Sequence, residues 1–202
     1  MFSLQYALIS IPVILVTITI HEYAHAKVAD MLGDPTPRQA GRLTLNPISH
    51  IDPIGFLMLF LVRFGWAKPV PINPNNFPDP RKGSAYVGLA GPVSNLFVAW
   101  FLGLVIKFFP FEILGYGPAV LLGNILAFAV WINIALAVFN LIPIPPLDGH
   151  HVLEAVLPYE QAEALHRVGQ YGFLILIFIL MFPPSRMLLV SVIELIYKFM
   201  LL

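Results

Sequence analysis

Thr19-Ile20-His21-Glu22-Tyr23-Ala24-His25 stands at the end of the first apolar run of the chain. An α-helix has about 3.6 residues per turn, so two histidines four residues apart lie on the same face. Their imidazole nitrogens can therefore reach one metal ion, and the Glu22 carboxylate follows directly after the first of them. Because apolar residues precede this stretch, we expect its helix to lie in a membrane.

The composition restricts the class of protein. The 202 residues are 58% hydrophobic and 11% charged, whereas charged residues make up about 25% of an average soluble domain. So few charges cannot cover a water-facing surface, which indicates an integral membrane protein in contact with the lipid bilayer. The formal net charge is zero, so no basic excess indicates a nucleic-acid partner. The chain has no cysteine, and a metal must therefore be held by His, Asp or Glu.

Apolar stretches separated by proline-rich segments predict an all-α polytopic membrane protein with about five to six membrane segments. The first runs from Ser3 to Asp30, longer than the roughly 20 residues that span a bilayer. The others are residues 54–64, 84–109, 118–141, 171–182 and 187–202. Residues 153–166 are more polar and predict an exposed amphipathic helix. We expect one domain over residues 1–202, with a catalytic core at about 3–157 and two C-terminal membrane segments at about 168–202.

The segments that follow the first helix have a different character. Residues 31–53 and 65–74 are rich in glycine and proline, which exclude a long helix. Arg42–Leu45 alternates as a short strand does, and the apolar piece at 54–64 is too short to span. We therefore expect a re-entrant unit made of a short β-hairpin and a short helix. Residues 42–48 or 66–73 would offer a strand edge to an unwound peptide.

The distribution of lysine and arginine predicts the orientation in the membrane. With the N-terminus outside, only Lys107 and Arg186 of the 11 basic residues fall outside, in line with the excess of basic residues in cytoplasmic loops. The same topology brings His25 and Asp148 to the cytoplasmic ends of their segments. We expect a multi-pass protein of a prokaryotic cell membrane, with its active site toward the cytoplasmic side.

Asp148 is the preferred third ligand for a metal held by the two histidines. A catalytic zinc has three protein ligands and an open position for water, so a third His, Asp or Glu must lie at the same depth. Asp148 follows a proline-rich helix end, and Gly149 after it permits a sharp backbone turn. The structural alternative is that Asp148 caps the helix that begins near His150.

The pattern H-E-x-x-H is typical of zinc proteases, in which both histidines bind the metal and the glutamate acts on water. Glu22 is therefore the candidate general base. The alternative is an intramembrane transporter or channel that binds a metal, because ionisable groups at membrane depth also line ion paths. Hydrolysis needs a base beside the ligand and transport does not, so Glu22 favours a protease. A homologue that binds membrane helices without cutting them is a third possibility.

The chain resembles the site-2 proteases, a family of intramembrane zinc metalloproteases. The resemblance covers roughly residues 15–150 and rests on three motifs: His21-Glu22-Tyr23-Ala24-His25, Gly91-Pro92-Val93-Ser94-Asn95, and Asn140 through Pro143 and Pro145 to Asp148-Gly149. It implies that His21, His25 and Asp148 hold one Zn²⁺ per chain and that Glu22 is the general base. It further implies that Asn140 binds substrate or stabilises the oxyanion, with Asn95 nearby in the substrate-binding site.

The resemblance also implies the kind of partner. Members of the family cut a transmembrane or near-membrane segment of another membrane protein, in regulated intramembrane proteolysis. The chain is similar to the small, minimal branch of the family, without PDZ or CBS domains. Two assignments have structural alternatives: Asn95 could serve helix packing alone, and Asn140 could be no more than a polar helix end.

Overall fold

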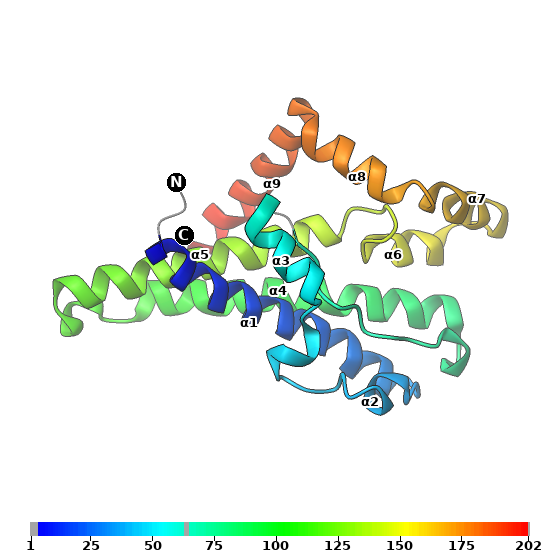
Figure 1. The fold of residues 1–202 in the computed structure, drawn as a ribbon, viewed down its shortest axis with the longest axis horizontal. Coiled ribbons are helices and arrows are strands. Elements are labelled where there is room, and N and C mark those ends of the chain that lie inside the picture. The colour runs from blue at the N-terminus through cyan, green and yellow to red at the C-terminus, as the bar shows by residue number, and fades with distance from the viewer. Residues whose placement is uncertain (1–3, 63–64, 202) are drawn as a thin grey trace.

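The fold is a bundle of long helices with shorter helices over its middle and toward one end (Figure 1), seen in a computed structural model that describes residues 4–62 and 65–201. The long helices are α1 (Leu4–Met31), α4 (Pro80–Phe108) and α5 (Tyr116–Asn140). All three helices pack against one another, and α4 makes the most extensive contacts. The prediction of an all-helical membrane protein is confirmed at this level, because these three helices are long and apolar enough to cross a membrane.

The predicted ends of the long helices agree closely with the structure. α1 was expected at residues 3–30 and α5 at 118–141, each within two residues of the observed bounds. α4 begins earlier than the predicted residue 84. The Asp79 side chain accepts hydrogen bonds from the backbone N–H groups of Arg81 and Lys82, and Pro80 occupies the first helical position. Both features are common helix-starting signals.

The C-terminal helices differ from the expected membrane segments. α8 (Gly172–Met181) has 10 residues, too few to span on its own, but with α7 (Tyr159–Gly169) it forms a pair bent by 72°, which fits a broken span or a re-entrant loop. α9 (Pro183–Leu201) contains Arg186, Glu194 and Lys198. Within residues 4–62 and 65–201 there are three candidate spans, or four with the bent pair. The predicted number of five to six segments is not confirmed.

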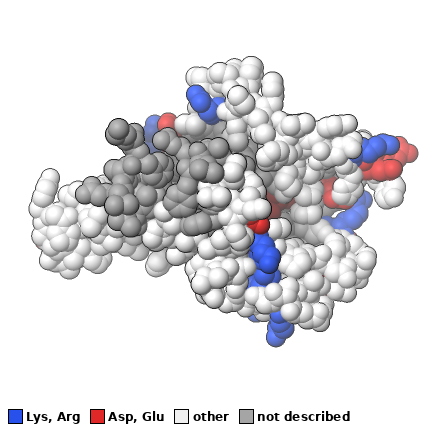
Figure 2. All heavy atoms as spheres, viewed as in Figure 1, with Lys and Arg blue, Asp and Glu red and all other residues white. Residues whose placement is uncertain are grey.

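The predicted amphipathic helix at 153–166 is two helices instead of one. α6 (Gly149–Val156) ends before Leu157, whose ψ of 147° is extended. Pro158 follows, and proline disfavours helical backbone in the residue before it. The exposed character is confirmed for α7, whereas most of α6 is half-buried. Charged side chains gather in the region of α6, α7 and α2 (Thr36–Gln39), and the end where α4 and α5 meet is uncharged on the face shown in Figure 2.

The strand predicted at Arg42–Leu45 does not form, because local hydrogen bonds occupy its backbone. The Arg42 N–H donates to the Pro37 carbonyl in a turn, the Asn46 N–H donates to Thr44 Oγ1, and His50 Nε2 lies 2.8 Å from the Thr44 carbonyl oxygen. Such side-chain and turn contacts compete with a sheet ladder. The prediction of a strand edge at 42–48 is therefore wrong.

The remaining part of the re-entrant unit is a short helix with one β-bridge. η1 (Pro47–His50) leads to α3 (Pro53–Val62), which has 10 residues and agrees with the predicted short apolar piece at 54–64 up to Val62; residues 63 and 64 lie outside the described part of the chain. Ile51 and Ala67 form an isolated antiparallel bridge. The predicted hairpin is not confirmed beyond this contact.

Asp34 ties the loop after α1 to the segment before α4. The side chain is fully buried and accepts hydrogen bonds from Thr36 N and Oγ1, from Asn73 N and from Asn76 Nδ2 of η2 (Pro74–Asn76). Burial alone would raise the pKa of Asp34, but these hydrogen bonds outweigh burial and lower it. The charged Asp34 carboxylate therefore holds the loop after α1 and the segment before α4 together through hydrogen bonds.

The apolar core lies where α4, α5 and α9 meet, around Ala99, Val130, Ile134 and Ile193. α4 and α9 approach closely at Gly103, where a Cβ would lie 2.6 Å from the Met200 carbonyl oxygen. Between α4 and α5 the chain turns through η3 (Phe111–Leu114). A second cluster of Ala29, Phe77 and Val87 packs α1 against α4, and the candidate site is built on these helices.

Candidate metal centre

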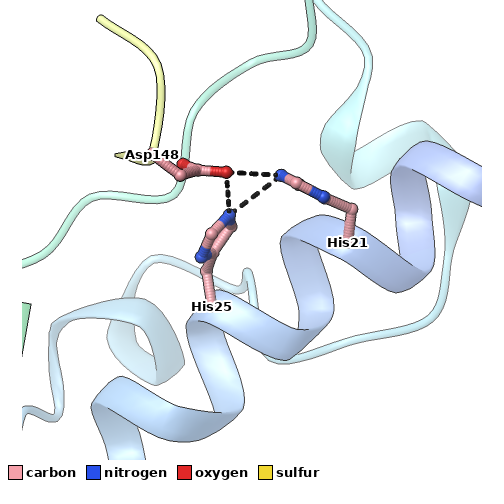
Figure 3. Close-up of side chains that lie close together, drawn as sticks. All are labelled: His21, His25 and Asp148. Atoms are coloured by element: carbon pink, nitrogen blue, oxygen red, sulfur yellow. Dashed lines mark hydrogen bonds and ion pairs between the residues drawn. The ribbon is translucent and has the colours of Figure 1, made fainter. Parts of the chain in front are cut away.

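The side chains of His21, His25 and Asp148 point toward one another (Figure 3). His21 Nε2 lies 3.0 Å from His25 Nε2 and 3.0 Å from Asp148 Oδ2, and His25 Nε2 lies 3.4 Å from the same oxygen. The histidines share one face of α1, and both are buried. Asp148 comes from the turn between α5 and α6. The structure thus brings together the three residues that the sequence analysis selected as ligands.

The second nitrogen of each histidine has an oxygen partner. His21 Nδ1 lies 2.6 Å from Asn95 Oδ1, and His25 Nδ1 lies 2.7 Å from the Val87 carbonyl oxygen, both on α4. A carbonyl oxygen only accepts hydrogen bonds, so each Nδ1 carries the hydrogen and donates it. Each Nε2 then presents a lone pair toward the other and toward Asp148.

These three converging atoms fit a metal ion. With both Nε2 atoms unprotonated, no hydrogen lies between them and Asp148 Oδ2, and this buried oxygen has no hydrogen-bond donor among the described residues. Such a group of acceptors repels itself unless a cation lies among them. Zinc bonds of about 2.0–2.2 Å in a tetrahedral arrangement place ligand atoms about 3.3 Å apart. The observed separations of 3.0, 3.0 and 3.4 Å are close to that value.

Gly91 on α4 leaves the space that a metal would need. A Cβ at this position would lie 2.4 Å from His25 Nε2 and 2.6 Å from His21 Nε2, closer than atoms in contact can approach. The sequence analysis identified Gly91 only as part of a family motif that permits close packing of helices. That it lies against the ligand nitrogens could be found only in three dimensions.

Asp148 does not cap α6. It occupies the N-cap position, but its side chain accepts no capping hydrogen bond. The next residue, Gly149, is needed for a different reason from the one expected. A Cβ there would lie 2.3 Å from the Leu141 carbonyl oxygen, so Gly149 permits close packing of the turn.

Glu22, the candidate base, is half-buried next to His21 and interacts electrostatically with His25 and with Arg42. Arg42 is only 3% exposed. Its Nη2 donates to the Lys68 carbonyl oxygen, while its Nε and Nη1 have no hydrogen-bond partner among the described residues. Burial lowers the pKa of Arg42, and Glu22 partly offsets this effect. Sequence reasoning missed that Arg42 is a buried cation within electrostatic range of Glu22, because it assigned Arg42 to a strand.

The two asparagines predicted to bind substrate occupy different surroundings. Asn140 is half-buried at the last residue of α5, and its Nδ2 donates to the Leu136 carbonyl oxygen at 3.0 Å. Asn95 is fully buried and contacts His21. For Asn95 the structure therefore shows a contact to a candidate metal ligand. Binding of substrate by either asparagine stays a prediction.

A second group of ligand-type side chains, His150, His151 and Glu154, lies on α6. Two of its three side chains interact with other groups of the protein. His150 Nδ1 donates to the Leu147 carbonyl oxygen at 2.5 Å, and Glu154 lies 3.1 Å from the exposed His166. Burial, together with the charge of His150, lowers the pKa of His151 to about 4, so His151 is neutral near pH 7. These contacts account for the group without a cation.

The profile described as Peptidase family M50 matches residues 110–183 of the chain, which include Asp148. The chain is 39% identical to "Putative zinc metalloprotease YwhC" of Bacillus subtilis over 89% of its own length and 85% of the relative. It is 33% identical to "Putative zinc metalloprotease Rip2" of Mycolicibacterium smegmatis over 84% of its own length. The match spans 65% of that longer relative.

An archaeal relative matches a shorter part of the chain. "Zinc metalloprotease MJ0392" of Methanocaldococcus jannaschii is 36% identical over 78 residues, which are 39% of this chain and 21% of the relative. No solved structure matches the chain significantly. The names of these relatives all describe zinc metalloproteases. They agree with the geometry of His21, His25 and Asp148, which fits a metal ion.

Proposed function

Because this chain belongs to peptidase family M50, the site-2 protease family of zinc metalloproteases, we propose that it hydrolyses a peptide bond in or near a transmembrane segment of another membrane protein. The observation that carries the proposal is the convergence of His21, His25 and Asp148 beside Glu22, on helices long and apolar enough to span a bilayer. A soluble protease would have no need of such helices around its site.

We assign His21, His25 and Asp148 as the ligands of one zinc ion per chain. Zinc bound there supplies a Lewis acid that makes water nucleophilic near neutral pH and polarises a peptide carbonyl. The chain itself sets the geometry of the ligands. Asn95 and Val87 fix the two imidazole rings through their Nδ1–H groups, and such hydrogen bonds to metal ligands orient them.

Glu22 moves the proton in the reaction. As the water oxygen bonds to the carbonyl carbon, the Glu22 carboxylate accepts a proton from that water. It then gives this proton to the amine nitrogen as the C–N bond breaks, so that a carboxyl and an amine terminus are released. The positive charge of Arg42 interacts with the Glu22 carboxylate, so Glu22 is not an isolated anion in a poorly solvated site.

An apolar cavity of about 500 Å³, lined on α1 by residues up to Thr19, supports a transmembrane segment as the substrate. Its walls come from α1, α5, α9 and residues 47–67, and they include Ile18, Trp131, Leu136 and Val190. Residues 66–73 are extended and partly exposed, so we propose that they pair with the unwound substrate. Asn140 would hydrogen-bond the substrate backbone near the scissile bond.

We further propose that the chain is a multi-pass protein of a prokaryotic cell membrane with its site at the cytoplasmic side. Two observations support this orientation. Most lysines and arginines follow the cytoplasmic pattern when the N-terminus is outside, and charged residues gather in the region of α2, α6 and α7 (Figure 2). α6 begins directly after Asp148, so the charged end and the metal site coincide.

Cleavage of a single-span substrate by the purified chain in liposomes tests the proposal. Wild type should cut, and Glu22→Gln should reduce cleavage at least 1,000-fold while it retains one zinc per chain, because the base is lost and the ligands are not. Glu163→Gln, on the exposed face of α7, is the matched control and should cut as wild type does.

The same liposomes separate the proposal from the transporter alternative. A zinc-sensitive dye inside them should report no zinc uptake, with wild type or with Glu22→Gln. Zinc uptake without cleavage would support a transporter, and equal cleavage by Glu22→Gln and wild type would contradict the role of Glu22.

A further inference from the structure

The hydrogen bond between His21 and Asn95 begins a chain of buried polar contacts across three helices. Asn95 Nδ2 donates to Asn133 Oδ1 at 2.8 Å, and Asn133 Nδ2 donates to Thr17 Oγ1 at 3.0 Å. Asn95 lies on α4, Asn133 on α5 and Thr17 on α1, and none is more than 2% exposed. A continuous path therefore joins α5 to the ring of a candidate metal ligand.

These contacts are directional. The remaining hydrogen of Asn95 Nδ2 faces the Thr17 carbonyl oxygen at 3.3 Å, and that of Asn133 Nδ2 faces the Ala129 carbonyl oxygen at 2.8 Å. Each amide thus places both hydrogens on acceptors and its oxygen on a donor. If the Asn133 amide were flipped, its NH₂ group would face the NH₂ group of Asn95. Its oxygen would then face Thr17 Oγ1 and the Ala129 carbonyl oxygen. Only one orientation satisfies both side chains.

We propose that Asn133 is a positioning residue of the metal centre, which acts on His21 through Asn95. By accepting from Asn95 Nδ2, Asn133 keeps Asn95 Oδ1 turned toward His21 Nδ1. That oxygen accepts the ring hydrogen, so the hydrogen stays on Nδ1 and the Nε2 lone pair faces His25 and Asp148. The inference rests on the proposed role of His21 as a metal ligand, and it assigns a role to Asn133 and Thr17, which lie outside the motifs.

The apolar surroundings of Thr17, Asn95 and Asn133 make the hydrogen bonds between them important. All three residues lie in helices that are candidate membrane spans, where an unsatisfied polar group has no water to bond. Replacing Asn133 by an apolar residue leaves the Asn95 NH₂ group without one acceptor and frees the amide to turn. Loss of a hydrogen-bond partner behind a metal ligand commonly lowers metal affinity about 10–100-fold.

Zinc affinity of the purified full chain, measured by competition with a chromophoric chelator, tests the inference. Asn133→Leu should bind zinc at least about tenfold more weakly than wild type. Asn124→Leu is the matched control, because Asn124 is an exposed asparagine on the same helix, and its affinity should equal that of wild type. Nitrogen NMR of the metal-free chain gives a second readout: wild-type His21 should be protonated on Nδ1, and Asn133→Leu should show a mixture of tautomers.

Thr17 provides a milder pair of variants in case Asn133→Leu does not fold. Thr17→Val removes the acceptor for Asn133 Nδ2 and should weaken zinc binding, whereas Thr17→Ser retains the hydroxyl and should not. Wild-type zinc affinity and a single His21 tautomer in folded Asn133→Leu, or in Thr17→Val, would overturn the inference. Neither zinc affinity nor the His21 tautomer depends on cleavage. If the variants changed both as expected but the wild type cut no substrate, the proposed function would be contradicted and the role of Asn133 would not.

Discussion

Gly91 lies directly against His25: a Cβ at residue 91 would be 2.4 Å from the His25 nitrogen that faces Asp148. α4 therefore contributes to the metal centre by the absence of a side chain as well as through Asn95 and Val87. A hydrogen atom on Gly91 is all that separates the α4 backbone from two ligands on α1. The candidate site therefore requires that α4 approach α1 this closely at Gly91.

Gly91→Ala should abolish tight zinc binding. The added methyl group occupies the space beside both Nε2 atoms, so the ligands must move apart or α4 must shift from α1. We expect zinc affinity at least 100-fold weaker than that of wild type, measured by chelator competition, with loss of cleavage. Gly123→Ala, where a Cβ meets nothing within 4 Å on α5, should leave both properties unchanged. Full zinc affinity in Gly91→Ala would show that the helices lie farther apart than described.

Removal of the metal should lower the stability of the chain. A ligand that binds only the folded state at 1,000 times its dissociation constant stabilises it by about 4 kcal/mol. Chelation should therefore lower the midpoint of thermal unfolding in detergent, and added zinc should restore it. Asp148→Ala should remove this zinc dependence, whereas His166→Ala, at an exposed histidine of α7, should keep it. A zinc-dependent shift that persisted in Asp148→Ala would place the metal elsewhere.

Asp34→Ala should destabilise the fold by about 3 kcal/mol, because it removes the buried, charged acceptor of the N–H groups of Thr36, Asn73 and Asn76. The folded pKa of Asp34 is below its ordinary value of 3.8. Its stabilising contribution is therefore complete above pH 3.8 and is lost as the pH falls through the folded pKa. Denaturant unfolding should show the difference between wild type and variant shrinking below pH 3.8. A difference that grew toward acid would contradict this sign.

Gly172→Ala should disturb the turn that carries Asp148. Gly172 begins α8, and a Cβ there would lie 1.7 Å from the Pro145 carbonyl oxygen. We expect a loss of about 2 kcal/mol in stability together with weaker zinc binding. Gly169→Ala meets only the Pro145 side chain, at 3.0 Å, so its effects should be smaller. Equal behaviour of the two variants in thermal unfolding would argue against this contact.

The parts predicted well from sequence are those where one local signal dominates. The long apolar runs set α1, α4 and α5, and the spacing of His21 and His25 placed both imidazoles on one helical face. Asp148 was chosen by elimination among ligand types, with support from the family resemblance, and the structure brings it to the histidines. The ligand roles themselves stay a prediction until a metal is measured.

The parts that were missed depend on contacts between distant segments. Alternation of side chains at Arg42–Leu45 predicts a strand only if backbone groups are available, and here turns and side chains occupy them. Pro158 divides a helix whose pattern of polar and apolar residues continues across the break. The partnership of Asn95 with Asn133, and the burial of Arg42 beside Glu22, arise from the packing of helices and leave no trace in residue spacing.

The order of the ligands along the chain has a consequence for biosynthesis. α1, which carries His21 and His25, is made first, whereas Asp148 follows α5. A nascent chain that has inserted only α1 and α4 therefore has the proposed base and two of the proposed ligands but lacks the third. The metal centre cannot be completed until the translation machinery has released the turn after α5 and that turn has folded back onto α1. If the proposed function holds, the chain gains the ability to cut other membrane proteins only after the bundle has assembled.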